Sequence, residues 1–255
     1  MLTALLHAQH NTVALAEPMQ VAHLATDPAR LVAETTRFLH ETRVDILRMG
    51  QGPSITQKEL GEQTTNFFGD HAPGGTLRES LSKRRSLAIR KPLTPDFRLF
   101  IKHPALFTAH WRDLSARYSL FANIRSPLAV LASWQTVALP VNKGQLPVGE
   151  RNDQVLQARL AQTQITLDRQ IVILEWFLRI YAQFPRQNVL RYEDIVQDQT
   201  TLLRTWFENA DWVHMPLTHH PISKRYPDID LDALRFALRP LQPLITFFYP
   251  EGMPE

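Results

Sequence analysis

Short apolar runs alternate with longer stretches of helical periodicity along most of the chain, and this alternation predicts strands and helices in turn. The runs typical of buried strands cover residues 12–15, 97–102, 118–124 and 188–191. Neighbouring parallel strands need a crossover connection, which is usually a helix. The order therefore predicts an α/β fold in which helices flank a parallel sheet.

The segments between these strands carry helix signals. Asp27 stands before Pro28 as a capping residue stands before a first-turn proline, and Gly50 follows the last position of the same helix. The periodicity predicts helices around residues 2–6 and at 28–49, 104–117, 128–137, 155–184, 193–209 and 230–248, the last interrupted by Pro240 and Pro243. Residues 140–152 are predicted to form a loop.

Residues 50–95 break the pattern with repeated glycines and prolines. A structureless segment of this length is uncommon in a compact domain and is usually functional when present. We interpret it as a loop-rich insertion or lid on the substrate side of a single domain that spans residues 1–255. Its basic run, Lys83-Arg84-Arg85, fits a solvated loop, and a contact with an anionic acceptor or phosphate is the alternative.

Composition narrows the class of protein. The 255 residues are 44% hydrophobic and 21% charged, which excludes a disordered, collagenous or coiled-coil chain. A net charge of +3 is too small to indicate nucleic-acid binding, and the lack of cysteine excludes disulfides, thiolate metal sites and a cysteine nucleophile. No apolar run approaches the ~20 residues of a membrane helix. The first residues also lack the features of a secretory signal, so we expect a cytoplasmic protein.

Polar side chains stand where the predicted strands end. Because ligands of such sheets bind at the carboxyl ends of the strands, we expect the functional site there. The residues concerned are Glu17, Lys102, His103, Arg125 and the segment 191–193.

Arg125 closes one of these strands, and Ser133 lies two turns along the helix that Pro127 opens. A guanidinium offers a planar fork of donors and a hydroxyl offers one more, so the pair suits a phosphate group. The alternative is that Arg125 pairs with a surface carboxylate and Ser133 is a packed small residue.

Tyr192 stands at the end of the last predicted strand, before Glu193 and Asp194. An aromatic ring in this position can stack on a base, and the two acids suit the first turn of a helix. Taken alone, the segment is better explained as a capped helix with a buried tyrosine.

Together, in this order and roughly sixty residues apart, the Arg125/Ser133 segment and the Arg191-Tyr192-Glu193-Asp194 segment resemble the sulfotransferase family. This family moves a sulfuryl group from 3′-phosphoadenosine 5′-phosphosulfate (PAPS) to an acceptor hydroxyl or amine. The resemblance implies a P-loop-NTPase-like sheet, with Arg125 and Ser133 on the 3′-phosphate and Tyr192 near the adenine. It covers most of the chain, since residues 97–104 and 1–18 are also similar to family segments.

The resemblance also implies a base. Glu17 stands where several branches, tyrosylprotein sulfotransferases among them, carry a glutamate base, and an attacking alcohol must lose its proton. His103 is the alternative base, because other branches use a histidine after a Lys-x-His strand end. Lys102 would neutralise charge on the transferring group, although Lys102 and His103 have no spacer between them here. We favour Glu17; each of these residues could also be an ordinary polar residue at a strand end.

The family's glycine-containing loop, which cradles the 5′-phosphosulfate between the first strand and the first helix, is missing from this sequence. The chain starts at Met1-Leu2-Thr3-Ala4-Leu5-Leu6, a segment that resembles the helix after that loop. We therefore expect either a start upstream of Met1 or a shortened relative without the first strand and the P-loop. The chain as given should bind PAPS weakly, and restoring upstream residues should improve binding and transfer.

The sequence thus predicts a PAPS-dependent sulfotransferase, impaired in this form, that needs no metal. The acceptor, a small molecule, carbohydrate, lipid or peptide, would bind among residues 50–95, 140–152 and the helix around Trp176. One alternative is a non-catalytic binding or scaffold protein with the same fold. Another is a P-loop kinase, for which a Walker lysine and a magnesium-binding hydroxyl are missing.

Two histidine pairs, His7/His10 and His219/His220, bring no carboxylates at ligand spacing, so we expect no metal site. We likewise expect neither a nucleic-acid partner nor a membrane span.

Overall fold

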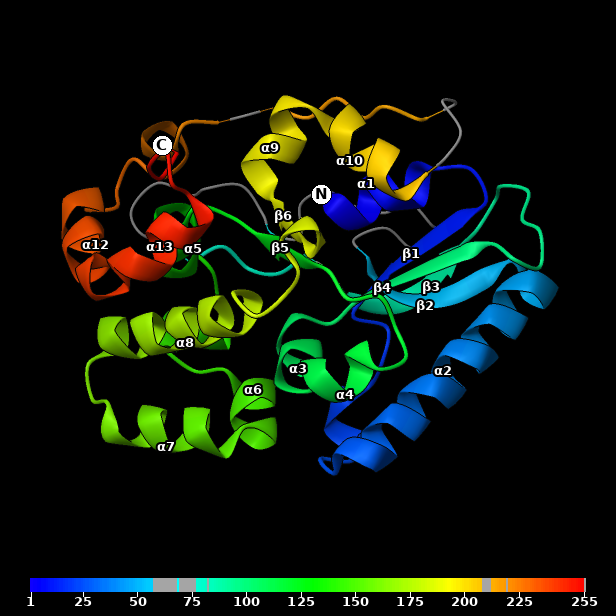
Figure 1. Cartoon of the computed structure of the whole chain (residues 1–255), viewed down its shortest axis with the longest axis horizontal. Coiled ribbons are helices and arrows are strands. Elements are labelled where there is room, and N and C mark those ends of the chain that lie inside the picture. Colours follow the sequence, from blue (N-terminus) through cyan, green and yellow to red (C-terminus); the bar gives the residue numbers. More distant parts are fainter. Residues whose placement is uncertain (57–67, 69–76, 82, 208–211, 219, 255) are drawn as a thin grey trace. The chain divides into compact units, whose positions relative to one another are not determined.

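The computed structural model describes residues 1–56, 68, 77–81, 83–207, 212–218 and 220–254 (Figure 1). The chain divides into two compact units. Unit 1 consists of Met1–Gly69, Ser80–Arg117 and Phe207–Pro216, and unit 2 consists of Asp70–Glu79, Tyr118–Trp206 and Leu217–Glu255. The single domain that the sequence suggests stays a prediction, and each unit is described by itself.

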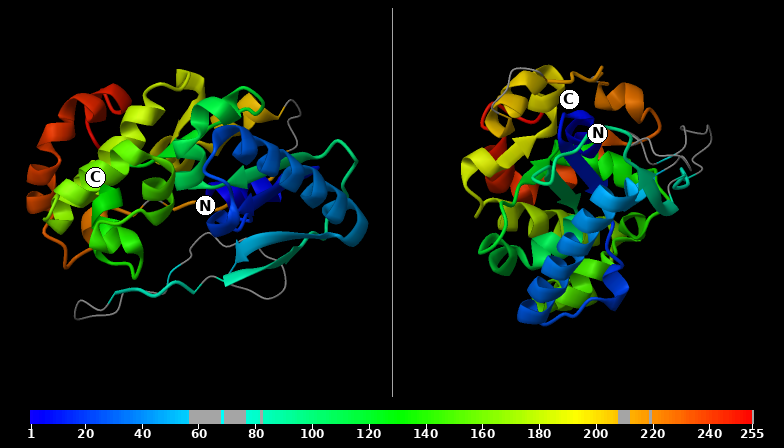
Figure 2. Two further views of the ribbon diagram at one scale, coloured as in Figure 1. Left: turned by 90° about the horizontal axis from the view of Figure 1, so that it is seen from below. Right: turned by 90° about the vertical axis from the view of Figure 1, so that its right-hand side faces the viewer.

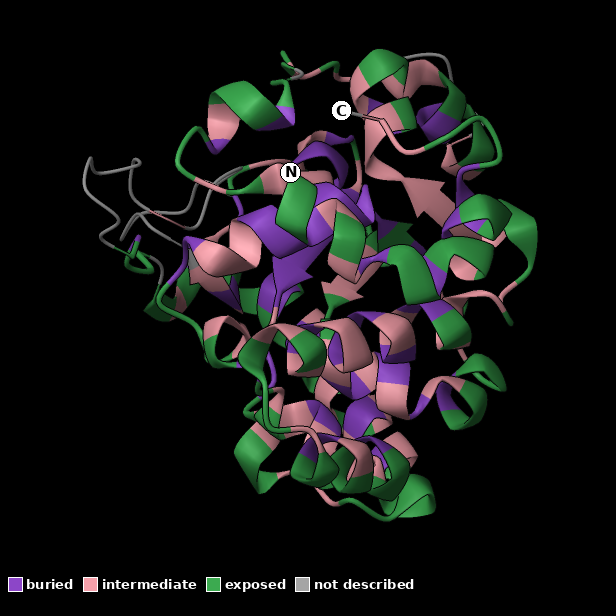
Figure 3. Ribbon diagram, turned by 90° about the vertical axis from the view of Figure 1, so that its left-hand side faces the viewer, coloured by how far each residue is buried: buried purple, intermediate pink, exposed green. Residues whose placement is uncertain are grey.

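Unit 1 is built on two pairs of strands. Its elements are α1 (Leu2–Ala8), β1 (Thr12–Ala16), η1 (Val21–His23), α2 (Pro28–Met49), β2 (Gln51–Thr56), β3 (Lys83–Ala88), β4 (Arg98–Lys102), α3 (Pro104–Ala109) and α4 (Trp111–Ser115). The strand β1 is buried along its whole length (Figure 3, purple) and pairs in parallel with β4, from Thr12 opposite Arg98 to Ala16 opposite Lys102. The strands predicted at 12–15 and 97–102 are thus confirmed.

The helix α2 follows its local sequence signals. The side chain of Asp27 accepts a hydrogen bond from the N–H of Arg30, and Gly50 ends the helix at a φ of 64°. The apolar side of α2 reaches the core through Ile46, which belongs to one cluster with Val13, Leu15, Ile89 and Phe97.

The antiparallel pair β2–β3 corrects part of the predicted loop-rich insertion at 50–95. The helix α2 lies against β2 (Figure 2). This close packing requires the glycine at position 52, because a Cβ there would stand 3.2 Å from Cγ1 of Ile46. Ser54 joins the pair to the end of β1, since its Oγ accepts a hydrogen bond from the N–H of Ala16 at 3.0 Å. Most of residues 57–76 lie outside the described residues, so the interpretation as a lid stays a prediction.

Unit 2 holds a second parallel pair and most of the helices. Its elements are β5 (Ala122–Ile124), α5 (Pro127–Gln135), η2 (Pro140–Lys143), α6 (Pro147–Asn152), α7 (Gln154–Gln162), α8 (Thr166–Tyr181), η3 (Arg186–Asn188), β6 (Val189–Arg191), α9 (Tyr192–Gln197), α10 (Gln199–Trp206), α11 (Ile222–Arg225), α12 (Leu231–Ala237), η4 (Arg239–Leu241) and α13 (Gln242–Phe248). The core joins α5, α8, α12 and α13, with Leu131, Leu178, Leu238 and Ile245 among its buried residues.

Several predicted bounds in unit 2 are wrong. The helix expected at 155–184 is divided into α7 and α8, and residues 140–152 contain η2 and α6. At the division, Nη1 of Arg169 donates to the carbonyl of Leu160 and, at 3.1 Å, to that of Thr163, both at the end of α7. Nε of Arg169 donates to the carbonyl of Gly144 at 2.9 Å, which ties α8 to the end of η2. The strand expected at 118–124 is reduced to β5, and the helix expected at 193–209 is divided at Asp198.

The architecture is α/β, with small parallel sheets flanked by helices. Within the described ranges, no helix combines the length and the apolar character needed to cross a membrane.

We predict that Gly144→Ala destabilises the protein more than Gly50→Ala. Both glycines have a left-handed φ, 63° and 64°, which costs a side-chain-bearing residue about 1–2 kcal/mol. At Gly144, however, a Cβ would also stand 2.6 Å from Cβ of Arg169, whereas the nearest atom at Gly50 is 3.6 Å away. Overpacking adds about 1–3 kcal/mol. Urea unfolding of both variants measures the difference, and equal losses would contradict it.

Candidate functional site

Parallel pairing of β5 with β6 brings Arg125 and Tyr192 to the same edge of a sheet. The last register pair is Ile124 with Arg191, and the two site residues directly follow it. The guanidinium carbon of Arg125 lies 4.8 Å from the centre of the Tyr192 ring, a cation–π contact. The structure thus unites two residues that the sequence places at separate strand ends.

The guanidinium of Arg125 has no charged partner among the described residues. It is half-buried, and no hydrogen bond or ion pair to it occurs in this part of the chain. A guanidinium carries five N–H donors and stays charged. A half-buried one without an acceptor is therefore ready to bind an anion.

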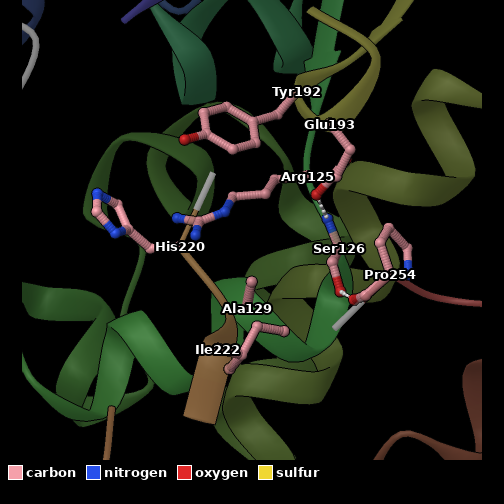
Figure 4. Close-up of a pocket in the computed structure, with 8 residues that line it drawn as sticks. All are labelled: Arg125, Ser126, Ala129, Tyr192, Glu193, His220, Ile222 and Pro254. Atoms are coloured by element: carbon pink, nitrogen blue, oxygen red, sulfur yellow. Dashed lines mark hydrogen bonds between the residues drawn. The ribbon is translucent and has the colours of Figure 1, made fainter. Parts of the chain in front are cut away.

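A pocket opens beside this guanidinium (Figure 4). Figure 4 shows the guanidinium directed toward His220, with the Tyr192 ring beside the Arg125 side chain. Glu193 lies at the opposite end of the Arg125 side chain from His220. The lining residues are Arg125, Ser126, Ala129, Tyr192, Glu193, His220, Ile222 and Pro254. The pocket is narrow, with about 10 Å³ for the centre of a water molecule, so side chains at its mouth must shift for a phosphate group to enter.

A second pocket, of about 170 Å³, is lined by His220, Lys224 and Arg225. His220 belongs to both pockets, so cationic or titratable side chains continue from Arg125 along one surface. Sequence reasoning considered His220 only as part of a histidine pair and missed Lys224 and Arg225. The sequence signal for Lys224 and Arg225 is the basic run in Ser223-Lys224-Arg225. It was not used because no strand end is predicted beside this irregular segment.

Ser133 does not line the Arg125 pocket. It lies half-buried near the end of α5 and interacts with the buried phenol of Tyr226. Burial acts to raise the pKa of Tyr226, but the hydrogen bond with Ser133 and the positive charges of Arg125 and Arg225 bring this pKa below its ordinary value. Arg125 and Ser133, the two residues that the sequence assigns to the phosphate, therefore both interact with the phenol of Tyr226.

The second group of predicted residues lies in unit 1, at the ends of β1 and β4. Nζ of Lys102 stands 3.4 Å from Oε1 of Glu17, and the N–H of Glu17 donates to the carbonyl of Lys102 at 2.8 Å. The side chains of Glu17 and Lys102 are 41% and 45% exposed. An ion pair this exposed adds little stability, and both side chains reach solvent.

Glu17 has a strained backbone. Its φ is 46°, in the left-handed region that costs a side-chain-bearing residue about 1–2 kcal/mol. Such outliers persist where the surrounding structure enforces them, and they cluster at functional sites. The strain therefore favours a functional role for Glu17 over that of an ordinary strand-end residue.

His103 has a different environment from Lys102, although the two are neighbours in sequence. Its ring is 5% exposed, and Nε2 accepts a hydrogen bond from the N–H of Met19 at 2.9 Å. Burial, with the charges of Arg84 and Lys102, lowers the pKa of His103 to about 3. A neutral ring whose acceptor nitrogen is occupied is a poor general base, so the geometry favours Glu17.

Arg84 lies close to this strand edge, whereas His7 and Lys91 lie at the end of α1. Nη1 of Arg84, from the Lys83-Arg84-Arg85 run, donates to the carbonyl of Pro18 at 2.5 Å, so the run is part of β3 rather than of a solvated loop. On α1, burial and the charge of Lys91 lower the pKa of His7 to about 4. Lys91 donates to the carbonyl of Gln9 at 2.9 Å, which satisfies backbone at the end of this helix.

Within the described ranges, no three or more His, Cys, Asp or Glu side chains form a group that could hold a metal ion. Of the histidines that raised this question, His219 lies outside the described residues.

Comparison of the chain with protein-family models, with curated proteins and with solved structures gives no match. The resemblance to sulfotransferases therefore depends on the residues named above and stays a prediction.

We predict that acid destabilises unit 1 through His7 and His103. Their pKa values, about 4 and about 3, lie below the ordinary histidine value of about 6.5. At pH values between the folded pKa and about 6.5, each histidine binds a proton in the unfolded chain but not in the folded protein. The free energy of unfolding therefore falls as the pH drops below about 6.5, by about 1.4 kcal/mol per pH unit for each histidine. Urea unfolding between about pH 7 and pH 5 measures this slope.

His103→Gln tests the assignment, because glutamine still accepts the hydrogen bond from Met19 but does not titrate. Below about pH 6, where the Met1 amino group with its pKa lowered to about 6 by burial no longer contributes, it should remove about half of the slope. His23→Gln, at an exposed position, is the matched control and should leave the slope unchanged. An unchanged slope in His103→Gln would show that this histidine is not the source.

Proposed function

We propose that this chain is a sulfotransferase that uses PAPS as the donor of the sulfuryl group. In this proposal, the sheet of unit 2 belongs to a P-loop-NTPase-like fold and holds the nucleotide. Arg125 binds the 3′-phosphate, and Tyr192 contacts the adenine. Ser133, which does not line the narrow pocket, becomes the second donor to the phosphate when the pocket widens to admit it. Glu17 of unit 1 takes the acceptor proton.

The observation that carries the proposal is the guanidinium of Arg125, which stacks on Tyr192 at 4.8 Å and has no described acceptor. A phosphate monoester supplies the missing acceptors, since guanidinium groups bind phosphate oxygens through paired hydrogen bonds. The aromatic ring beside it suits the attached base, because base–aromatic stacking contributes about 1–3 kcal/mol.

Lys224 and Arg225 extend the positive surface beyond Arg125. An isolated phosphate does not need so broad a cationic surface, whereas a nucleotide with two separate anionic groups does. This favours an adenosine bisphosphate over a mononucleotide as the ligand.

The chemistry assigned to unit 1 is proton removal. As the acceptor oxygen forms its bond to sulfur, the sulfur–oxygen bond to the nucleotide breaks and the acceptor proton passes to Glu17. The exposed carboxylate of Glu17 can accept it, and the neighbouring ammonium of Lys102 suits the charge on the transferring group. The displacement is direct and needs no covalent enzyme intermediate.

We predict that the chain binds 3′-phosphoadenosine 5′-phosphate (PAP) more tightly than adenosine 5′-phosphate (AMP), which lacks the 3′-phosphate. Arg125→Gln should weaken PAP about 10- to 100-fold and Ser133→Ala about 10-fold, because each loses hydrogen bonds to a charged group. AMP binding should change little in both variants. Tyr192→Ala should weaken both nucleotides, since both contain adenine. Isothermal titration calorimetry measures these affinities.

Arg235→Gln is the matched control, because Arg235 is a surface arginine of α12 that pairs with Asp232. It should leave both affinities unchanged. No saturable PAP binding with a Kd below about 1 mM would contradict the nucleotide site and favour a scaffold role.

We further predict that Glu17→Gln lowers sulfuryl transfer about 10²- to 10⁴-fold, the range of general base catalysis, while PAP affinity stays unchanged. His103→Gln should retain most of the activity, because the side-chain acceptor for Met19 is kept. Transfer from radiolabelled PAPS to a panel of phenols, sugars and amines measures both variants. The opposite order of losses would make His103 the base.

A further inference from the structure

One hydrogen bond ties together the residues that directly follow Arg125 and Tyr192. The N–H of Ser126 donates to Oε1 of Glu193 at 2.8 Å. Because Ser126 follows Arg125 and Glu193 follows Tyr192, this bond links the segment between β5 and α5 to the first turn of α9. The spacing of the guanidinium and the ring therefore depends on it.

The other oxygen of Glu193 has a partner from the C-terminal part of the chain. The hydroxyl of Tyr249 donates to Oε2 of Glu193 at 3.1 Å, and this tyrosine is 1% exposed. Burial, with the negative charge of Glu193, raises the pKa of Tyr249. The carboxylate is thus held by two protein donors from two different elements.

Ser126 cannot provide this link with its own side chain. It caps α5, yet its hydroxyl makes no capping bond and instead donates to the carbonyl of Pro254 at 3.1 Å. The carboxylate of Glu193 binds the N–H of this capping residue, as the glutamate of a capping box does. A negative charge is favourable there, because the N-terminal end of a helix is partially positive.

Glu193 is also oriented away from the anion site. In Figure 4 its carboxylate faces Ser126, whereas the guanidinium of Arg125 extends toward His220. A carboxylate repels a phosphate group, so Glu193 is not a ligand for it. Its contribution to the site is the position that it gives to Arg125 and Tyr192.

We propose that Glu193 is a positioning residue of the nucleotide site, which holds Arg125 against Tyr192 by accepting hydrogen bonds from Ser126 and Tyr249. This inference rests on the proposed function, since it concerns the same site. It adds that the C-terminal residues around Tyr249 contribute to nucleotide affinity without contacting the nucleotide.

The experiment compares Glu193→Ala, Glu193→Gln and Tyr249→Phe for PAP binding by calorimetry, at a temperature at which circular dichroism shows every variant folded. Glu193→Ala should weaken PAP about 10-fold, as expected for the loss of a supporting hydrogen bond behind a ligand-binding side chain. Tyr249→Phe should have a smaller effect, because it removes one of the two bonds. Glu193→Gln should bind PAP as tightly as the wild type or more tightly, since the amide keeps an acceptor for Ser126 and carries no negative charge.

Two controls separate positioning from charge and from stability. Asp194→Asn removes a neighbouring exposed carboxylate, which binds Arg191 at 2.7 Å, and should leave PAP affinity unchanged. Gly144→Ala lowers the stability of the same unit away from the pocket and should also leave the affinity unchanged. A coupling measurement completes the test: in an Arg125→Gln background, Glu193→Ala should weaken PAP no further, because the side chain that it positions is gone.

The inference would be overturned if Glu193→Ala bound PAP as tightly as the wild type. It would also be overturned if the loss of affinity in the double variant equalled the sum of the losses in Arg125→Gln and Glu193→Ala. If Glu193→Ala does not fold, Glu193→Asp and Tyr249→Phe carry the test, and wild-type affinity in both would overturn it equally. These results differ from failure of the proposed function, in which the wild-type protein itself does not bind PAP.

Discussion

The candidate nucleotide site depends on the parallel pairing of two short strands, β5 and β6. Each contributes only three residues to the pair, and the site residues are the next ones along the chain. A shift of this register by one residue would turn every side chain to the opposite face of the sheet. Arg125 would then no longer stack on Tyr192. The hydrogen bond between Ser126 and Glu193 secures this register at the point where the strands stop.

The charges of the described residues fall into two groups with different surroundings. In unit 2, Arg125 has no counter-charge, whereas Arg191 on the neighbouring strand is fully engaged with Asp194 and Glu251, and hydrogen bonding to these carboxylates raises its pKa. In unit 1, the paired Glu17 and Lys102 remain accessible while His103 is buried and neutral. Because Asp194 and Glu251 already bind Arg191, they leave the charge of Arg125 to an external anion.

Local signals made part of this structure predictable. Asp27 and Gly50 mark both ends of α2 because a cap and a left-handed glycine act on the residues beside them. The strand β2 was missed because Gly52 and Pro53 are typical of a loop, and the need for a glycine arises only from the approach of Ile46. The break between α7 and α8 was missed because residues 155–184 keep helical periodicity, and the hydrogen bonds from Arg169 to the carbonyls of Leu160 and Thr163 have no signal in the sequence. Arg125 and Tyr192 were predictable because strand ends are visible in sequence, whereas His220, Lys224 and the link from Ser126 to Glu193 depend on the tertiary fold.

The most direct test of this account is a crystal structure of the chain grown with PAP. It should place oxygens of the 3′-phosphate within hydrogen-bond distance of the Arg125 guanidinium, with the adenine beside the Tyr192 ring and Glu193 still bound to Ser126. A nucleotide bound elsewhere, with Arg125 still stacked on Tyr192 and without an anion, would contradict the account.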